Sequence, residues 1–364
     1  MNQPTNPSPC VVGGTSTYSK RLLGDLLGGP VVGSSGCTVR TREKSFVDWT
    51  ASLGALILGY RPPPIEAQRW LVPGLTTVEE KAAQLLVAHL GGRNQRVRWC
   101  KNGSDATEAG VRLARHYTQR SLIITNSYHG SHDALLPATT GKLGGVGPEN
   151  SHNLCRVQNP EDLLQALKAL PVAAVVMEPM TPHCLDWRLE EVREACTQRG
   201  TLLIFDEIIT GWRTRLGSAA LHIEPDLYTV GKAIGNGAPI AALVGKPALM
   251  GLLEEEVFFS GTYAGELLSL ASTFDTVEKL EATPYTRFQD WGEQLRTALQ
   301  GICVGYPQRL RLTLQGPQHL AFVRGLASRG VLVGWDFFQM ADHTPEALNQ
   351  TIQAIHATRK ELSL

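Results

Sequence analysis

The chain has 364 residues, enough for two domains, and its 34 Lys and Arg balance its 34 Asp and Glu to a formal net charge of zero. Nucleic-acid-binding proteins normally carry a basic surplus, because phosphate neutralisation supplies most of their affinity. Hydrophobic residues make up 43% of the chain and charged residues 19%, which indicates a large core rather than disorder. We therefore expect a small molecule or another protein as the partner, and no nucleic acid.

The cysteines indicate the compartment. Seven of them are scattered along the chain without a CxxC pair, which argues against a disulfide framework and a zinc ribbon and favours the reduced thiols of a cytoplasmic enzyme. The polar, Pro-rich N-terminus has no basic region followed by an apolar stretch, so no signal peptide is expected. No apolar run reaches the roughly 20 residues that a membrane helix needs, and no membrane partner is expected.

In chain order, residues 1–45 are rich in Gly, Pro, Ser and Thr and predict an irregular lead-in. A helix is expected next, then a strand, then a helix that Ser104 or Asp105 caps; after these, strands and helices alternate. The expected strands are Val97–Cys100, Ser121–Thr125, Val172–Met177 and Leu202–Phe205, and the expected helices are Glu79–His89, Pro160–Leu170 and Glu190–Arg199. Short apolar runs separated by helices are typical of a mostly parallel sheet with helices on both faces, so the predicted fold class is α/β.

The C-terminal part predicts a second, smaller unit. A long helical pattern runs from Gly265 to about Glu281, and the remainder mixes strands and helices. Strands are expected within Gly301–Thr313 and Gly330–Val333, and helices at Gln318–Ser328 and Pro345–Leu362. We predict a large α/β domain over residues 46–280, and a small α+β domain made of residues 1–45 and 281–364.

Several familiar nucleotide and hydrolase motifs are missing. None of the three Gly-Lys pairs completes a P-loop, no GxGxxG follows an early strand, and neither GxSxG nor HExxH occurs. The sequence therefore gives no support to a P-loop nucleotide site, a dinucleotide site, a serine-hydrolase elbow or a zinc-protease helix.

Two segments that follow expected strands can bind a flat, phosphorylated ligand. The small-residue turn at Gly103 and Ser104 feeds a helix N-terminus, whose N–H groups would hold a phosphate; an ordinary helix cap is the alternative. Tyr128 follows the next strand and could stack on a planar ring. His129, His132 and Asp133 beside it could instead suggest a metal site, but no further ligand has a recognisable spacing and no metal is expected.

Two more segments carry charged groups among apolar neighbours. Asp206 follows the apolar run Leu202–Phe205, where a carboxylate needs a cationic or hydrogen-bonding partner or else caps the next helix. Lys232 lies among small and apolar residues with glycines nearby, which suits a Schiff-base amine better than a lysine that snorkels to the surface. Phosphate turn, stacking aromatic, carboxylate and lysine, in that order, are what a pyridoxal phosphate (PLP) site needs.

The motifs NGSDATEAGVRLAR, YHGSHDA, VVMEP, IFDEIITGWR, GKAIGNGAPIAALVGK and SGTYAGELLSLAS, with ASLGALILGY before them, together resemble the class III PLP-dependent aminotransferases. Within that family the resemblance is strongest to the glutamate-1-semialdehyde aminomutase group and to its aminotransferase relatives in sugar and polysaccharide pathways. The matching motifs extend from about Phe46 to Ser272. The resemblance implies PLP fold type I, with PLP as the cofactor.

The resemblance also implies roles for single residues. The catalytic pair would be Lys232, which forms the Schiff base and carries protons, and Asp206, the partner of the pyridine nitrogen. The remaining cofactor-binding residues would be Gly103 and Ser104 on the phosphate, Tyr128 and Ile208 on the two ring faces, and Thr262 on the phosphate of the neighbouring subunit. Thr262 thus implies a homodimer with shared active sites. Glu178, in VVMEP, would lie near the cofactor.

One departure concerns the substrate. Aminomutases of this group carry an Arg for the substrate carboxylate in a segment that corresponds to residues 13–20, and here Lys20 stands roughly at that place. Lysine lacks the bidentate fork of arginine, which favours a different substrate.

We therefore expect an aminotransferase that moves an amino group from an amino acid donor to a small carbonyl acceptor, such as a sugar or another biosynthetic intermediate. The alternative is a glutamate-1-semialdehyde-type 2,1-aminomutase or another PLP isomerase. A third reading, a non-enzymatic scaffold, is disfavoured because Lys232, Asp206 and the phosphate turn occur together.

Overall fold

A computed structural model describes residues 17–62, 71–91, 95–138 and 141–364. The chain divides into two compact units, Met1–Pro62 with Pro284–Leu364 (unit 1) and Pro63–Thr283 (unit 2). The predicted large domain begins at residue 46, whereas Ser45–Asp48 pairs in parallel with Val331–Leu332 of unit 1. That pairing groups residues 46–62 with unit 1. Within the described ranges, no helix combines the length and apolar character needed to cross a membrane.

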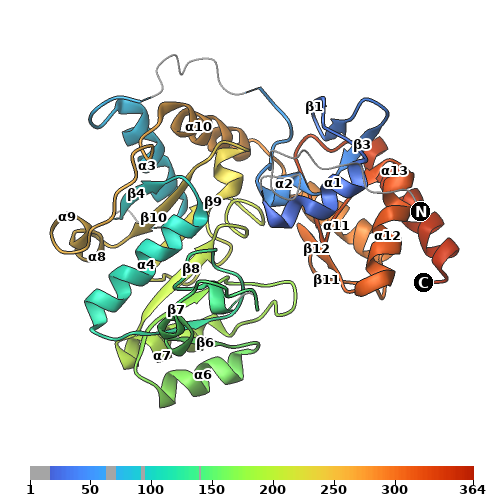
Figure 1. Ribbon diagram of the computed structural model, residues 1–364. Coiled ribbons are helices and arrows are strands. Elements are labelled where there is room, and N and C mark those ends of the chain that lie inside the picture. Colours follow the sequence, from blue (N-terminus) through green and yellow to red (C-terminus); the bar gives the residue numbers. More distant parts are fainter. Residues whose placement is uncertain (1–16, 63–70, 92–94, 139–140) are drawn as a thin grey trace. The chain divides into compact units, whose positions relative to one another are not determined.

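Unit 2 is built on a seven-stranded sheet (Figure 1). Its strands are β4 (Arg96–Cys100), β5 (Leu122–Thr125), β6 (Leu154–Arg156), β7 (Val172–Met177), β8 (Leu202–Glu207), β9 (Leu227–Gly231) and β10 (Ala241–Gly245). Its longer helices are α3 (Thr77–His89), α4 (Gly103–Thr118), α6 (Pro160–Ala169), α7 (Leu189–Arg199) and α10 (Leu267–Glu281). Short helical segments complete it: η3 (Leu136–Ala138), α5 (Pro148–His152), η4 (Lys232–Gly235), α8 (Pro247–Met250) and α9 (Leu252–Glu255).

The strand order is β4-β10-β9-β8-β7-β5-β6. Only β10 runs against its neighbours β4 and β9, so the predicted mostly parallel sheet is confirmed. Every residue of β7, β8, β9 and β10 is buried, as expected of strands covered on both faces. The strands other than β10 therefore end at the same edge of the sheet, where ligands bind in open α/β folds.

Helix α4 begins at this edge and packs along several strands of the sheet. The predicted cap, Ser104 or Asp105, is wrong: Asn102 is the N-cap, and its side chain accepts a hydrogen bond from the N–H of Asp105. The Asp105 carboxylate accepts in return from the Asn102 N–H, which completes a capping box. This reciprocal pair fixes where the helix starts and aims its first N–H groups at the sheet edge.

Unit 1 is a smaller α+β unit. Its helices are η2 (Tyr18–Lys20), α1 (Arg21–Leu27), α2 (Ala51–Gly54), α11 (Tyr285–Ala298), α12 (Gly316–Ser328) and α13 (Pro345–Leu362). Its strands are β1 (Gly33–Ser35), β2 (Thr38–Arg40), β3 (Ser45–Asp48), β11 (Cys303–Tyr306), β12 (Arg309–Leu312), β13 (Val331–Leu332) and β14 (Asp336–Phe338), in the two sheets β1-β2-β3-β13 and β11-β12-β14.

The predicted irregular lead-in is wrong for residues 17–45, because these residues form η2, α1 and the first two strands. Residues 1–16 lie outside the described residues. Within α2, Ser52 and Leu53 adopt left-handed backbone angles, with φ of 50° and 65°.

A buried carboxyl group shapes the loop after β8. Glu207 is fully buried, and its carboxylate accepts hydrogen bonds from the Ser218 hydroxyl at 2.5 Å, from the Ala219 N–H at 3.0 Å and from the Thr210 hydroxyl. These donors tie residues 210–219 back onto the strand that carries Asp206. Burial raises the pKa of Glu207 to about 7, against the lowering effect of these hydrogen bonds.

This shift predicts a pH dependence of stability. A carboxyl group whose pKa is higher in the folded state stabilises the fold while it is protonated, and this contribution is lost as the pH rises from about 4.5 to about 7. Glu207→Gln removes that loss. The free energy of unfolding is measured by urea denaturation. The value for the variant minus the value for wild type should therefore rise between pH 5 and 7.5, by roughly 1.4 kcal/mol for each unit by which the pKa of Glu207 is raised.

Glu278→Gln, at an exposed position in α10, is the matched control and should keep a constant difference from wild type. An equally constant difference for Glu207→Gln would show that Glu207 is ionised in both states throughout this pH range.

Candidate active site

Two of the predicted site residues lie at the ends of neighbouring strands. Asp206 lies near the end of β8, opposite Thr229 of β9, and Lys232 is the first residue after β9. Adjacent strands are about 4.8 Å apart, so the pairing brings the two side chains to the same edge. Lys232 is partly buried and has a φ of 45°, a left-handed backbone angle that is strained for a lysine. Strain of this kind concentrates at functional sites.

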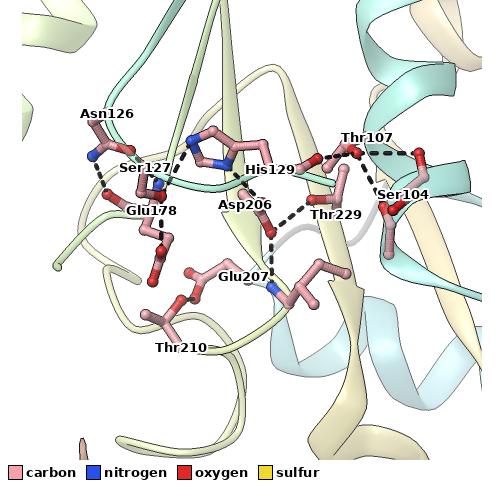
Figure 2. A network of polar contacts seen from close by, with 12 residues as sticks. Ser104, Thr107, Asn126, Ser127, His129, Glu178, Asp206, Glu207, Thr210 and Thr229 are labelled. Carbon is pink, nitrogen blue, oxygen red and sulfur yellow. Dashed lines mark hydrogen bonds and ion pairs between the residues drawn. The ribbon is translucent and has the colours of Figure 1, made fainter. Parts of the chain in front are cut away.

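Asp206 is a buried carboxylate surrounded by donors. It is 4% exposed, and its Oδ2 accepts from His129 Nδ1 at 2.7 Å. Its Oδ1 accepts from the Ile208 N–H at 3.0 Å and from the Thr229 hydroxyl at 3.3 Å. These donors are the hydrogen-bonding partners that the sequence led us to expect for Asp206, and they hold its carboxylate in one orientation (Figure 2).

His129 is a site residue to which sequence reasoning gave no role beyond the disfavoured alternative of a metal ligand. Its buried ring binds Asp206 on one side and lies 3.3 Å from the Ser127 hydroxyl on the other. His132 is exposed and lies 3.6 Å from Asp105. Among the described residues, no three His, Cys, Asp or Glu side chains are grouped to hold a metal. The position of His129 close to a strand end could have marked it as a site residue, but the sequence does not show which side chain it faces.

The phosphate turn lies at the start of α4. A Cβ added at Gly103 would lie 3.0 Å from the Ile208 side chain, so a glycine at this position lets Ile208 pack closely against the start of α4. The Ser104 hydroxyl accepts from the Ser131 N–H at 3.0 Å, and Gly130 has a φ of 123° and no room for a side chain beside Ser104. Helix α4 has 16 residues, and the positive end of its dipole at Gly103 and Ser104 is suited to an anion.

The two predicted ring-contacting residues differ in exposure. Tyr128 is 56% exposed, between the partly buried Ser127 and the buried His129. Ile208 is partly buried and packs against the buried cluster of Cys100, Ala106 and Ala241. An exposed aromatic and a partly buried aliphatic side chain thus border the same strand ends.

Glu178 follows β7 and is joined to the loop after β5. It is 4% exposed, and its Oε1 accepts from the Ser127 hydroxyl at 2.8 Å. The Asn126 side chain donates to the Glu178 carbonyl at 2.9 Å and accepts from its N–H at 3.1 Å. Sequence reasoning missed Asn126 and Ser127, because short polar residues after a strand are common in loops.

Thr262 and Lys20 lie in other segments. Thr262 is exposed in the turn before α10, and Lys20 ends η2 in unit 1. The roles that the resemblance gives them remain predictions.

Comparison with known proteins gives the family. The model of the family described as aminotransferase class-III matches residues 29–359. A glutamate-1-semialdehyde 2,1-aminomutase of Aquifex aeolicus is 30% identical over 87% of this chain and 88% of its own length. That of Methanothrix thermoacetophila is 32% identical over 71% of this chain, a match that spans 66% of the relative. The resemblance to the aminomutase group is thereby confirmed.

Solved structures share the fold. The FumI protein of Sphingopyxis sp. MTA144, in a PLP-bound form, is 24% identical with a TM-score of 0.85, over 97% of this chain and 94% of that one. Ornithine aminotransferase of Toxoplasma gondii is 22% identical with a TM-score of 0.78, over 92% of each chain. These likenesses confirm the predicted PLP fold, and the family match carries the rest: the chain belongs to the class III aminotransferases, a family of PLP-dependent enzymes.

Proposed function

We propose that this protein is an aminotransferase that moves an amino group from an amino acid donor to a small carbonyl acceptor. The observation that carries the proposal is the pairing of β8 with β9, by which Asp206 and Lys232 lie at the ends of neighbouring strands, at one edge of the sheet. This arrangement favours a reaction that needs an amine to attach the cofactor and an anion to polarise its ring.

The residues at this edge fit PLP. Asp206 is held by donors in an acceptor orientation that suits a protonated pyridine nitrogen. The N-terminus of α4 at Gly103 and Ser104 would offer backbone N–H groups to a phosphate, with the Ser104 hydroxyl beside them. In this proposal Tyr128 covers one ring face and Ile208 the other.

When bound, PLP supplies an electron sink for charge that develops at the α-carbon of an amino acid. The Asp206 carboxylate keeps the pyridine nitrogen protonated, which the sink requires. The Lys232 amine would hold the cofactor and would act as the base that moves a proton from the α-carbon of the substrate. The strained φ of 45° at Lys232 fixes where its side chain leaves the strand end.

The proposal includes a homodimer with shared active sites. Thr262 would bind the cofactor phosphate of the neighbouring subunit, and it lies in an exposed segment with two large exposed side chains, Phe258 at 82% and Tyr263 at 64%. Exposed aromatic side chains grouped in one segment are typical of surfaces that another chain covers.

A glutamate-1-semialdehyde-type 2,1-aminomutase is the second candidate. It is favoured by the curated relatives of that name, which are 30–32% identical to this chain. Both reactions would use Lys232, Asp206 and the phosphate turn alike. Lys20, which the resemblance places roughly where the aminomutases carry an arginine, favours a different substrate, because lysine binds a carboxylate without a bidentate fork.

The half-reaction separates the two candidates. Purified protein loaded with PLP is mixed with one amino donor at a time, beginning with glutamate, and the absorption of the cofactor is recorded. A transferase converts the cofactor to pyridoxamine phosphate and releases one equivalent of the keto acid, 2-oxoglutarate in the case of glutamate. Glutamate-1-semialdehyde that isomerises, while no donor in the screen yields a keto acid, would contradict the transferase and support the aminomutase.

Two variants test the residue roles in the same assay. Lys232→Ala should lose the visible absorption of the attached cofactor. Asp206→Asn should still bind PLP, but its turnover should fall on the order of 10²–10³-fold, because the carboxylate that polarises the ring is gone. Wild-type turnover in Asp206→Asn would remove Asp206 from the reaction.

A further inference from the structure

A chain of hydrogen bonds runs from Glu178 to Asp206 across the carboxyl ends of β7, β5 and β8 (Figure 2). Glu178 Oε1 lies 2.8 Å from Ser127 Oγ, Ser127 Oγ lies 3.3 Å from His129 Nε2, and His129 Nδ1 lies 2.7 Å from Asp206 Oδ2. The Glu178 and Asp206 residues are each 4% exposed and the His129 side chain is 0% exposed. The polar groups therefore depend on partners within the protein.

The loop that carries His129 is also held through the backbone, at Glu178 and at the His129 carbonyl. The Asn126 side chain pairs with both backbone groups of Glu178, which fixes the loop after β5 against the end of β7. The Thr107 hydroxyl of α4 donates to the His129 carbonyl at 2.6 Å. The ring is thereby placed between the two carboxylates by elements on either side of it.

The protons of this chain can be counted. The Ser127 hydroxyl carries one proton and donates it to Glu178 Oε1 at 2.8 Å. The Ser127 oxygen is then left to accept from His129 Nε2, which lies 3.3 Å away.

On the other side of the ring, His129 Nδ1 donates to Asp206 Oδ2 at 2.7 Å. The two ring nitrogens thus link the Ser127–Glu178 pair to Asp206.

We propose that Ser127 and Glu178 are positioning residues for Asp206. They act through His129, by holding its ring so that Nδ1–H is donated to Asp206 Oδ2. The consequence for catalysis rests on the proposed function, in which the Asp206 carboxylate would interact with the pyridine nitrogen. The hydrogen-bonded chain itself is a property of the protein without cofactor and is tested there.

The first measurement uses the apoenzyme labelled with ¹⁵N-histidine. The His129 resonances are identified by their loss in His129→Asn. The proposal predicts a proton on His129 Nδ1 that exchanges slowly with water, because the side chain is fully buried. A His129 ring protonated at Nε2 alone would overturn it.

The second measurement tests the part played by Ser127. Ser127→Ala removes one hydrogen bond, which should speed exchange of the Nδ1 proton and raise the dissociation constant for PLP by about 2–10-fold. Ser127→Thr keeps the hydroxyl and should restore both values. Thr201→Val removes a hydroxyl that donates to Val172 O at 2.9 Å at the other end of the sheet, and serves as the control. A Ser127→Ala protein that behaves like this control would overturn the proposal.

The same variant in the Asp206→Asn background shows whether the effect passes through Asp206. If it does, Ser127→Ala raises the PLP dissociation constant no further in that background, because interacting residues give non-additive effects. A full additional effect would contradict the proposal. If Asp206→Asn binds PLP and turns over like wild type, the assigned role of Asp206 fails, while the ¹⁵N measurement on the apoenzyme still tests the chain separately.

Discussion

The candidate site depends on one constraint: a carboxylate is buried at the end of a strand. Asp206 is 4% exposed, and a buried charge without partners would cost several kcal/mol. The protein meets this cost with donors from three places, the histidine after β5, the backbone of Ile208 two residues on, and the threonine opposite on β9. Each donor in turn fixes the segment that supplies it, so the carboxylate organises the strand ends around itself.

The sheet topology makes this arrangement possible. Because every strand of the sheet except β10 runs in the same direction, the residues after β4, β5, β7, β8 and β9 meet at one edge. The side chains of Ser127, Glu178 and Lys232, far apart in the sequence, are thereby brought to the same region as Asp206. A helix start suited to an anion, a lysine and a buried carboxylate thus lie together at the edge where we propose the cofactor site.

The sequence predicted the parts of this picture that depend on local pattern. The buried runs of β7 and β8 are continuous and apolar, and Asp206 is conspicuous because it interrupts one. The antiparallel β10 and the helix α11 were missed, because strand direction depends on distant pairing and Tyr285–Ala298 mixes polar and apolar residues closely. The contact between His129 and Asp206 could not be predicted either, because the two residues are 77 positions apart in the chain.

Some local choices were also ambiguous. Asn102, Ser104 and Asp105 can all cap a helix, and only the capping box selects Asn102. The residues 17–45 contain many turn-forming residues, yet pairing of β2 with β3 makes strands of part of this segment. Tertiary pairing thus overrides local composition where the local signals are weak.

The central claim is that the sheet edge at β8 and β9 holds PLP through Lys232. The most direct measurement is reduction of the loaded protein with borohydride, followed by digestion and mass spectrometry of the peptides. We expect a phosphopyridoxyl group on Lys232 and on no other lysine. A label on a different lysine, such as Lys101, with Lys232 unmodified, would contradict it.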